Sequence, residues 1–164
     1  MYIWKTSKLI DDLKHNRLTS QNFKNYYIAN VLIAILGMYA IHLAPRYNSQ
    51  TILVEMILSI GILISGINAL FTANQRNAGH EFLNRIISLM LPITIKVVIL
   101  SLIPYLLVSG YLHYLDGSLT DPALANPALE WLDTAFSVTV QLILFWRLYV
   151  ALKKINDPST SPSV

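Results

Sequence analysis

Residues 52–73, ILVEMILSIGILISGINALFTA, decide the fold of this chain because they form one long and almost entirely apolar run. An α-helix rises about 1.5 Å per residue, so about 20 apolar residues cross a hydrocarbon layer of about 30 Å. Glu55 is the only charged residue in the run. A run of this length and composition predicts a transmembrane helix.

Three further apolar runs of similar length surround it, at residues 27–43, 86–112 and 131–152. The run at 86–112 is longer than a span requires, and Pro92 and Pro104 within it can supply a kink or a tilt. The expected fold is therefore all-α, a polytopic integral membrane protein with four transmembrane helices.

The composition of the whole chain favours burial in lipid. Of its 164 residues, 54% are hydrophobic and 13% are charged, against about 45–50% and about 25% in soluble domains. So few charges cannot cover a water-facing surface, which sets aside the soluble enzymes. Four spans also leave no length for a second folded domain. Because the chain has no cysteine, disulfides and thiolate chemistry are excluded.

The positive residues favour one orientation in the membrane. Ten of the 12 lysine and arginine residues precede the first span, border the connection between the second and third, or close the fourth: Lys5, Lys8, Lys14, Arg17, Lys24, Arg76, Arg85, Arg147, Lys153 and Lys154. By the positive-inside rule, this distribution predicts that both termini are cytoplasmic. The membrane would be the cytoplasmic (inner) membrane if the source is bacterial.

The two ends of the chain differ from the expected membrane domain at residues 25–154. Residues 1–24 form a cytoplasmic arm, in which a helix starting near Thr6 or Ser7 would carry apolar residues on one face and charged residues around it. We expect this amphipathic helix to lie in the membrane interface. The tail, residues 155–164, is rich in Ser, Thr and Pro and is expected to be disordered.

Polar side chains at membrane depth are the candidates for function, because each is costly there unless it faces protein or water. Helical spacing places them in stripes that approach from opposite sides of the membrane. The third span carries Arg85, Ser88, Pro92 and Lys96 from the cytoplasmic border to about mid-membrane. The fourth span carries Asp133, Ser137 and Gln141 from the outer border, and the second span adds Glu55.

Two interpretations of these stripes stay open, and the role of Lys96 differs between them. A lysine near mid-membrane must be neutral, paired, snorkelling toward the membrane border or facing water, and Asp133 and Glu55 are its best partners. On the first interpretation the stripes form a polar path, and the chain is a small homo-oligomeric channel or a conduit for ions or solutes. On the second they are interhelical contacts, each worth about 0.6 kcal/mol. The chain is then a non-catalytic subunit that anchors, assembles or regulates a larger membrane complex.

Small residues recur at every fourth position of the second span, at Gly61, Ser65 and Ala69. Such a pattern allows another helix to approach closely, within one subunit or between subunits. Four helices of this length leave little internal volume, so a pore would more readily form around a symmetry axis. A homo-oligomer is therefore expected on either interpretation.

Polar residues near the cytoplasmic border form a second candidate site. Asn68, Arg76, Asn77 and Arg147 are expected there. Together they can bind an anionic lipid headgroup or a membrane or cytoplasmic protein partner. The plainer interpretation of the connection that holds Arg76 and Asn77 is a tight turn rich in helix caps.

A redox or metal-binding function is the third and weakest alternative. His42 and His113 lie near the outer ends of two spans and could together ligate a haem or a metal ion. The chain has no compact ligand spacing and no recognisable arrangement of catalytic residues, so we expect no cofactor, no metal and no enzymatic activity. Nucleic-acid binding is excluded because the net charge of +3 arises from residues at the membrane borders.

Overall fold

The computed structural model of the chain describes residues 2, 4–43, 49–75, 81–116 and 127–156, and within these ranges it holds five helices and no strand. The helices are α1 (Thr6–Lys14), α2 (Ser20–Leu43), α3 (Ser49–Ala73), α4 (Phe82–Asp116) and α5 (Pro127–Asn156). The described part of the chain is therefore all-α, as the sequence predicts.

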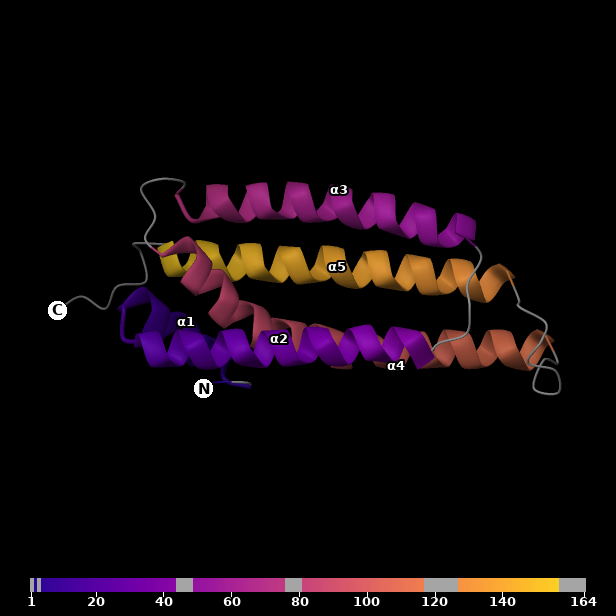
Figure 1. Cartoon of the computed structure of the whole chain (residues 1–164), viewed down its shortest axis with the longest axis horizontal. Helices are drawn as coiled ribbons and strands as arrows, with labels where there is room; N and C mark the ends of the chain where they lie inside the picture. Colours follow the sequence, from indigo (N-terminus) through magenta and orange to yellow (C-terminus); the bar gives the residue numbers. More distant parts are fainter. Residues whose placement is uncertain (1, 3, 44–48, 76–80, 117–126, 157–164) are drawn as a thin grey trace.

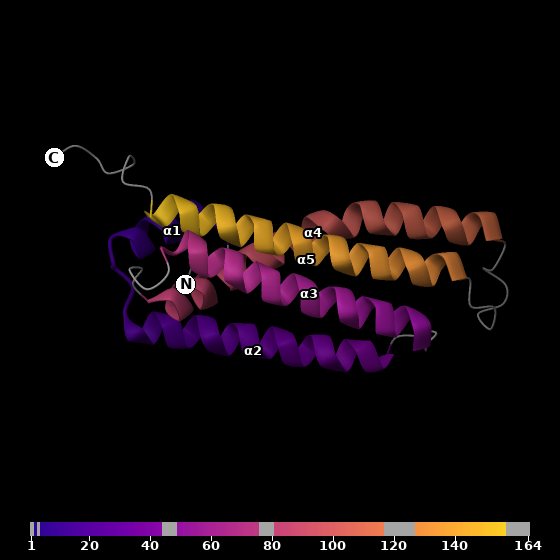
Figure 2. The same ribbon diagram turned by 90° about the horizontal axis from the view of Figure 1, so that it is seen from above.

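Helices α2 to α5 run lengthwise beside one another, and the short α1 lies at the end of the bundle where the chain begins and ends (Figure 1). We call this end the termini end. Helix α5 packs against both α3 and α4, α2 contacts α4, and α1 contacts α4 and α5. Figure 2 shows α2 and the last turns of α4 on opposite sides of the bundle. The first residues of α2 and α4 and the last residues of α3 and α5 therefore meet at the termini end.

Three of the described helices are long and apolar enough to cross a membrane: all of α3, residues Phe82–Leu112 of α4, and Glu130–Asn156 of α5. Their sides carry large apolar residues that are mostly exposed, such as Ile57, Leu107 and Leu142. Such surfaces are stable only in contact with lipid or with other apolar helices. The chain is thus compatible with an integral membrane protein, whereas the fourth span, expected at residues 27–43 within α2, stays a prediction.

The buried apolar core lies at the termini end. It is formed by α1, the first turns of α2 and α4, and the last turns of α3 and α5, through Leu9, Leu13, Tyr26, Leu70, Leu89, Leu91, Ile93, Val97, Leu148, Ala151, Leu152 and Ile155. Beyond Val97, α4 exposes Leu100, Leu106 and Leu107. Tight packing is concentrated at one end, and over the rest of their length the helices expose apolar side chains to their surroundings.

A bend near the start of α4 shapes this core. The first turns of α4 run obliquely to the rest of the bundle before the helix turns parallel to α2 (Figure 1). Pro92 lies in this region and is fully buried. It cannot donate to the carbonyl of Ser88, which loosens the helix there. The amide of Asn30 donates to the neighbouring carbonyl of Ile87 at 2.8 Å and so attaches α2 to the bend.

Helix α1 is part of the core. Leu9 and Leu13 are buried, and the chain leaves α1 through Asn16, whose φ of 51° is the left-handed conformation common after helix ends. The N–H of Tyr2 donates to the hydroxyl of Tyr26 at 2.7 Å, which ties the arm to α2. A hydrogen bond to the carboxylate of Asp12 raises the pKa of Tyr2. The location of α1 relative to a membrane interface stays a prediction.

Several sequence-based expectations concern residues outside the described ranges. They include the turn that carries Arg76 and Asn77 and the tail beyond Asn156, where α5 ends. The side chains of His42 and His113 are also outside the described part of the structure.

Candidate functional site

A buried arginine joins three helices at the termini end. The guanidinium of Arg85 on α4 donates to Oδ1 of Asn74 at 3.0 Å and to Oδ1 of Asn156 at 2.9 Å. Arg85 is 7% exposed and Asn74 is fully buried. In turn, Nδ2 of Asn156 donates to the carbonyl of Ala73 at 2.9 Å, which satisfies one of the free carbonyls at the end of α3. We call Arg85, Asn74 and Asn156 the arginine cluster.

The surroundings of Arg85 explain why a charge is tolerated there. An arginine stays protonated in proteins, so its buried charge requires compensation. Asn74 directly follows α3, and Asn156 is the last residue of α5. The carbonyl ends of two helices, each with a partial negative charge, therefore meet at the guanidinium. The cluster thus holds a cation with two amide oxygens and helix dipoles, and the carboxylate of Glu81 nearby adds a favourable charge.

Lys96 lies in a different environment from the one that its sequence position predicts. Its Nζ donates to Oγ1 of Thr6 on α1 at 2.7 Å. Among the described contacts it joins neither Asp133 nor Glu55, its expected partners. The lysine is half-buried and lines a cavity of about 390 Å³ between α1, α4 and α5. The arm of the chain thus reaches Lys96.

The polar residues of α5 contact two different helices. The carboxylate of Asp133 accepts a hydrogen bond from the hydroxyl of Tyr105 on α4 at 2.7 Å. Two turns further along, Nε2 of Gln141 donates to the hydroxyl of Ser59 on α3 at 2.8 Å. Ser137, between them, is half-buried. The described contacts therefore do not bring the stripe of α5 together with Lys96.

On α4 the predicted stripe does follow the packed face. Arg85, Ser88 and Pro92 are buried and Lys96 is half-buried. The hydroxyl of Ser88 is buried without a hydrogen-bond partner among the described atoms. Helical spacing therefore identified the inner face of α4, although it did not identify the partners.

The small residues of α3 lie on an open face. A side chain added at Gly61 would meet no atom within 4 Å, and Ser65 and Ala69 are exposed. The hydroxyl of Ser65 donates to the carbonyl of Gly61 on its own helix at 2.7 Å. Close packing within the subunit occurs instead at Gly66, where the ring of Phe145 from α5 occupies the place of a side chain.

The expected binding residues at the cytoplasmic border are only partly described. Asn68 is exposed on α3, and Arg147 is exposed on α5 with its guanidinium over the ring of Trp146, 5.3 Å from the ring centroid. No contact in the described ranges joins Asn68 to Arg147. Within those ranges, no three His, Asp or Glu side chains lie close enough to hold a metal ion.

Four residues that take part in these contacts were not singled out from the sequence as partners: Thr6, Asn74, Tyr105 and Asn156. Asn74 is 11 positions from Arg85, and the other three are 28 to 90 positions from the residues that they bind, so no helical spacing relates the partners. The position of Asn74 and Asn156 next to helix ends was the one available signal, because an amide there can satisfy free carbonyls. Comparison of the chain with models of protein families, with curated proteins and with solved structures found no match.

Proposed function

We propose that the chain is a non-catalytic subunit with four membrane spans that acts by associating with other helices in the bilayer, as a homo-oligomer or as an anchor within a larger complex. Both termini would be cytoplasmic, in the inner membrane if the source is bacterial. No resident cofactor or metal is part of this proposal.

The distribution of the polar contacts supports this proposal. Gln141 binds Ser59, Asp133 binds Tyr105, and Lys96 binds Thr6, so each pair joins two helices at its own level of the bundle. Interhelical hydrogen bonds of this kind hold membrane helices together at about 0.6 kcal/mol each. Groups used in this way stabilise the helix bundle of the single chain and do not require a transported species.

The proposal rests mainly on the open face of α3. Gly61, Ser65 and Ala69 are exposed on the described subunit, whereas α5 packs on the other face at Gly66. A stripe of small residues in a membrane helix lowers the distance at which a second helix can pack. The face is therefore suited to a helix of another subunit, either a second copy or a different membrane protein.

The test is the oligomeric state of a Gly61→Leu variant in detergent and in lipid nanodiscs. A matched control is Gly110→Leu on α4, where an added side chain also meets nothing within 4 Å. We expect Gly61→Leu to reduce association and Gly110→Leu to leave it unchanged. The thermal unfolding temperature of the monomeric subunit should be the same in the two variants. A wild-type chain that stays monomeric and co-purifies with no partner would contradict the proposal.

A conduit is the second candidate, favoured by the polar pair of Gln141 and Ser59 at the α3 and α5 interface and by the half-buried Lys96. In an oligomer, such groups could line a path around the symmetry axis. Ion flux from liposomes, compared between wild type and Lys96→Met at equal insertion, tests it. A change in flux would favour the conduit, and no flux from either protein favours the associating subunit.

The haem alternative, based on His42 and His113, has its own measurement. A Soret absorption band in the purified protein would support it, and a colourless preparation would remove it.

A further inference from the structure

A basic cavity lies between α1, α4 and α5 at the termini end. It has a volume of about 390 Å³, and Lys96, Arg147 and Lys154 contribute the charged side chains that line it. The hydroxyls of Thr6 and Ser7 on α1 line it as well, and no acidic side chain does. Three positive charges and two hydroxyls around one space are the chemistry that binds a phosphate group.

The charge of Lys96 is not compensated by a carboxylate in the described part of the chain. Its hydrogen bond is to the neutral hydroxyl of Thr6. The guanidinium of Arg147 lies over the ring of Trp146, which leaves its N–H donors free to bind an anion. The cavity therefore favours a negatively charged occupant.

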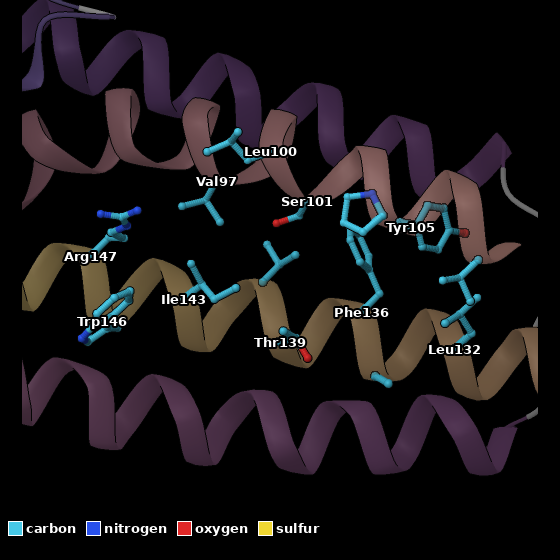
Figure 3. A pocket seen from close by; sticks show the side chains of 14 residues that line it. Val97, Leu100, Ser101, Tyr105, Leu132, Phe136, Thr139, Ile143, Trp146 and Arg147 are labelled. Carbon is cyan, nitrogen blue, oxygen red and sulfur yellow. The ribbon is translucent and has the colours of Figure 1, made fainter.

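An apolar groove continues from the basic cavity between α4 and α5. It has a volume of about 610 Å³ and shares Val97, Leu100 and Arg147 with the basic cavity. Figure 3 shows Arg147 at one end of this groove and Tyr105 and Leu132 toward the other, with side chains of the two helices facing each other. One continuous site thus has a basic end and an apolar length.

The groove is at least as long as one half of a bilayer is deep. It extends from Val97 to Val108 on α4 and from Leu132 to Arg147 on α5, which corresponds to about 16 Å and about 22 Å of helix at about 1.5 Å per residue. The hydrocarbon layer is about 30 Å thick, so one leaflet is about 15 Å deep. With its headgroup at the basic end, an acyl chain as long as one leaflet is deep would therefore fit within the groove.

We propose that this site binds one anionic phospholipid from the leaflet at the termini end. The phosphate lies among Lys96, Arg147 and Lys154, and an acyl chain lies between α4 and α5. The basic end selects the charge of the lipid, and the apolar groove selects a lipid over a soluble anion. The proposal does not depend on whether the chain associates with other subunits.

Trp146 lines the groove and provides the readout. The chain has three tryptophans, so Trp4→Phe with Trp131→Phe leaves Trp146 as the only one. This protein is placed in phosphatidylcholine vesicles that contain either phosphatidylglycerol or further phosphatidylcholine, the added lipid carrying brominated acyl chains that quench tryptophan on contact. We expect brominated phosphatidylglycerol to quench Trp146 more strongly at the same mole fraction.

Two variants that each remove one positive charge test whether the basic cavity causes the preference for phosphatidylglycerol. Lys96→Gln and Lys154→Gln should each lower the relative association constant of phosphatidylglycerol about fivefold, the effect of one basic residue near a membrane surface. Lys154 has no described hydrogen bond, so its variant tests the site without disturbing the contact between Lys96 and Thr6. The matched control is Lys153→Gln, an exposed neighbour that does not line the cavity and should keep the preference.

Three results would overturn the proposal. The first is equal quenching by the two brominated lipids in the wild-type protein. The second is an equal loss of preference in Lys153→Gln, which would show general attraction to a charged surface. The third is displacement of phosphatidylglycerol by millimolar inorganic phosphate, which would show a site for a soluble anion.

Discussion

Arg85 donates a hydrogen bond to the side chain of Asn156 at 2.9 Å, although the two residues are 71 positions apart in the chain. The contact joins the start of α4 to the last residue of α5. With Asn74, it fixes three helix ends in the region where the core is buried.

We expect Arg85→Met to destabilise the chain strongly, because it removes two hydrogen bonds to a charged group, each worth about 1.5 kcal/mol or more. The expected loss in the free energy of unfolding is about 3 kcal/mol. Thermal unfolding in detergent, followed by circular dichroism, measures it. Lys153→Met removes an exposed charge in the same region and should have little effect. Equal stability of the two variants would show that the cluster is dispensable.

Gly66→Val should separate α3 from α5. The new side chain would occupy the place of the Phe145 ring, and overpacking of this kind typically costs about 1–3 kcal/mol. Gly61→Val on the same helix has open space around it and should leave the stability of the single subunit unchanged. The two variants, compared by thermal unfolding at a concentration where the chain is monomeric, check the packing. If Gly61→Val alone were destabilising, the face of α3 that packs against α5 would be the one at Gly61 and not the one at Gly66.

The docking of α1 can be measured by labelling, because the chain contains no natural cysteine. Ala151→Cys places a thiol on α5 in the cavity that Thr6 and Ser7 also line. Leu13→Ala removes a buried contact worth about 2 kcal/mol or more, so it should raise the rate of maleimide labelling by about tenfold or more. Lys5→Ala, an exposed change beside the same helix, should not. Rapid labelling before any change to α1 would mean that the arm does not cover α5.

The contact between Gln141 and Ser59 is expected to be weak. A double-mutant cycle with Gln141→Leu and Ser59→Ala should give a coupling energy of about 0.6 kcal/mol, the average for hydrogen bonds between membrane helices. Reversible unfolding in mixed micelles supplies the four stabilities. A coupling near zero would show that the 2.8 Å contact contributes nothing to the fold.

The sequence predicts the helices well because apolar length is a local property. The runs at residues 52–73, 86–112 and 131–152 each lie within a helix long and apolar enough to span a membrane. Helical spacing also identified the inner face of α4, through Arg85 and Ser88, because residues three or four apart share a face wherever the helix lies.

The partners of the polar residues could not be predicted in the same way. Thr6 is 90 positions from Lys96, and their contact depends on where α1 packs, which no periodicity specifies. The pattern of small residues on α3 predicted a packing face at Gly61, whereas the single subunit packs at Gly66. Composition alone does not tell which of two small-residue faces meets a neighbouring helix of the same chain.

The packing of α1 against α5 also has a consequence for biosynthesis. Helix α1 precedes α5 in the chain, so Leu9 and Leu13 are synthesised before Leu148 and Ile155, with which they form the core. Leu13 and Leu148 are 135 positions apart, so at about 5–20 residues per second about 7–27 seconds of translation separate them. We therefore expect α1 to complete its packing only after α5 has been synthesised.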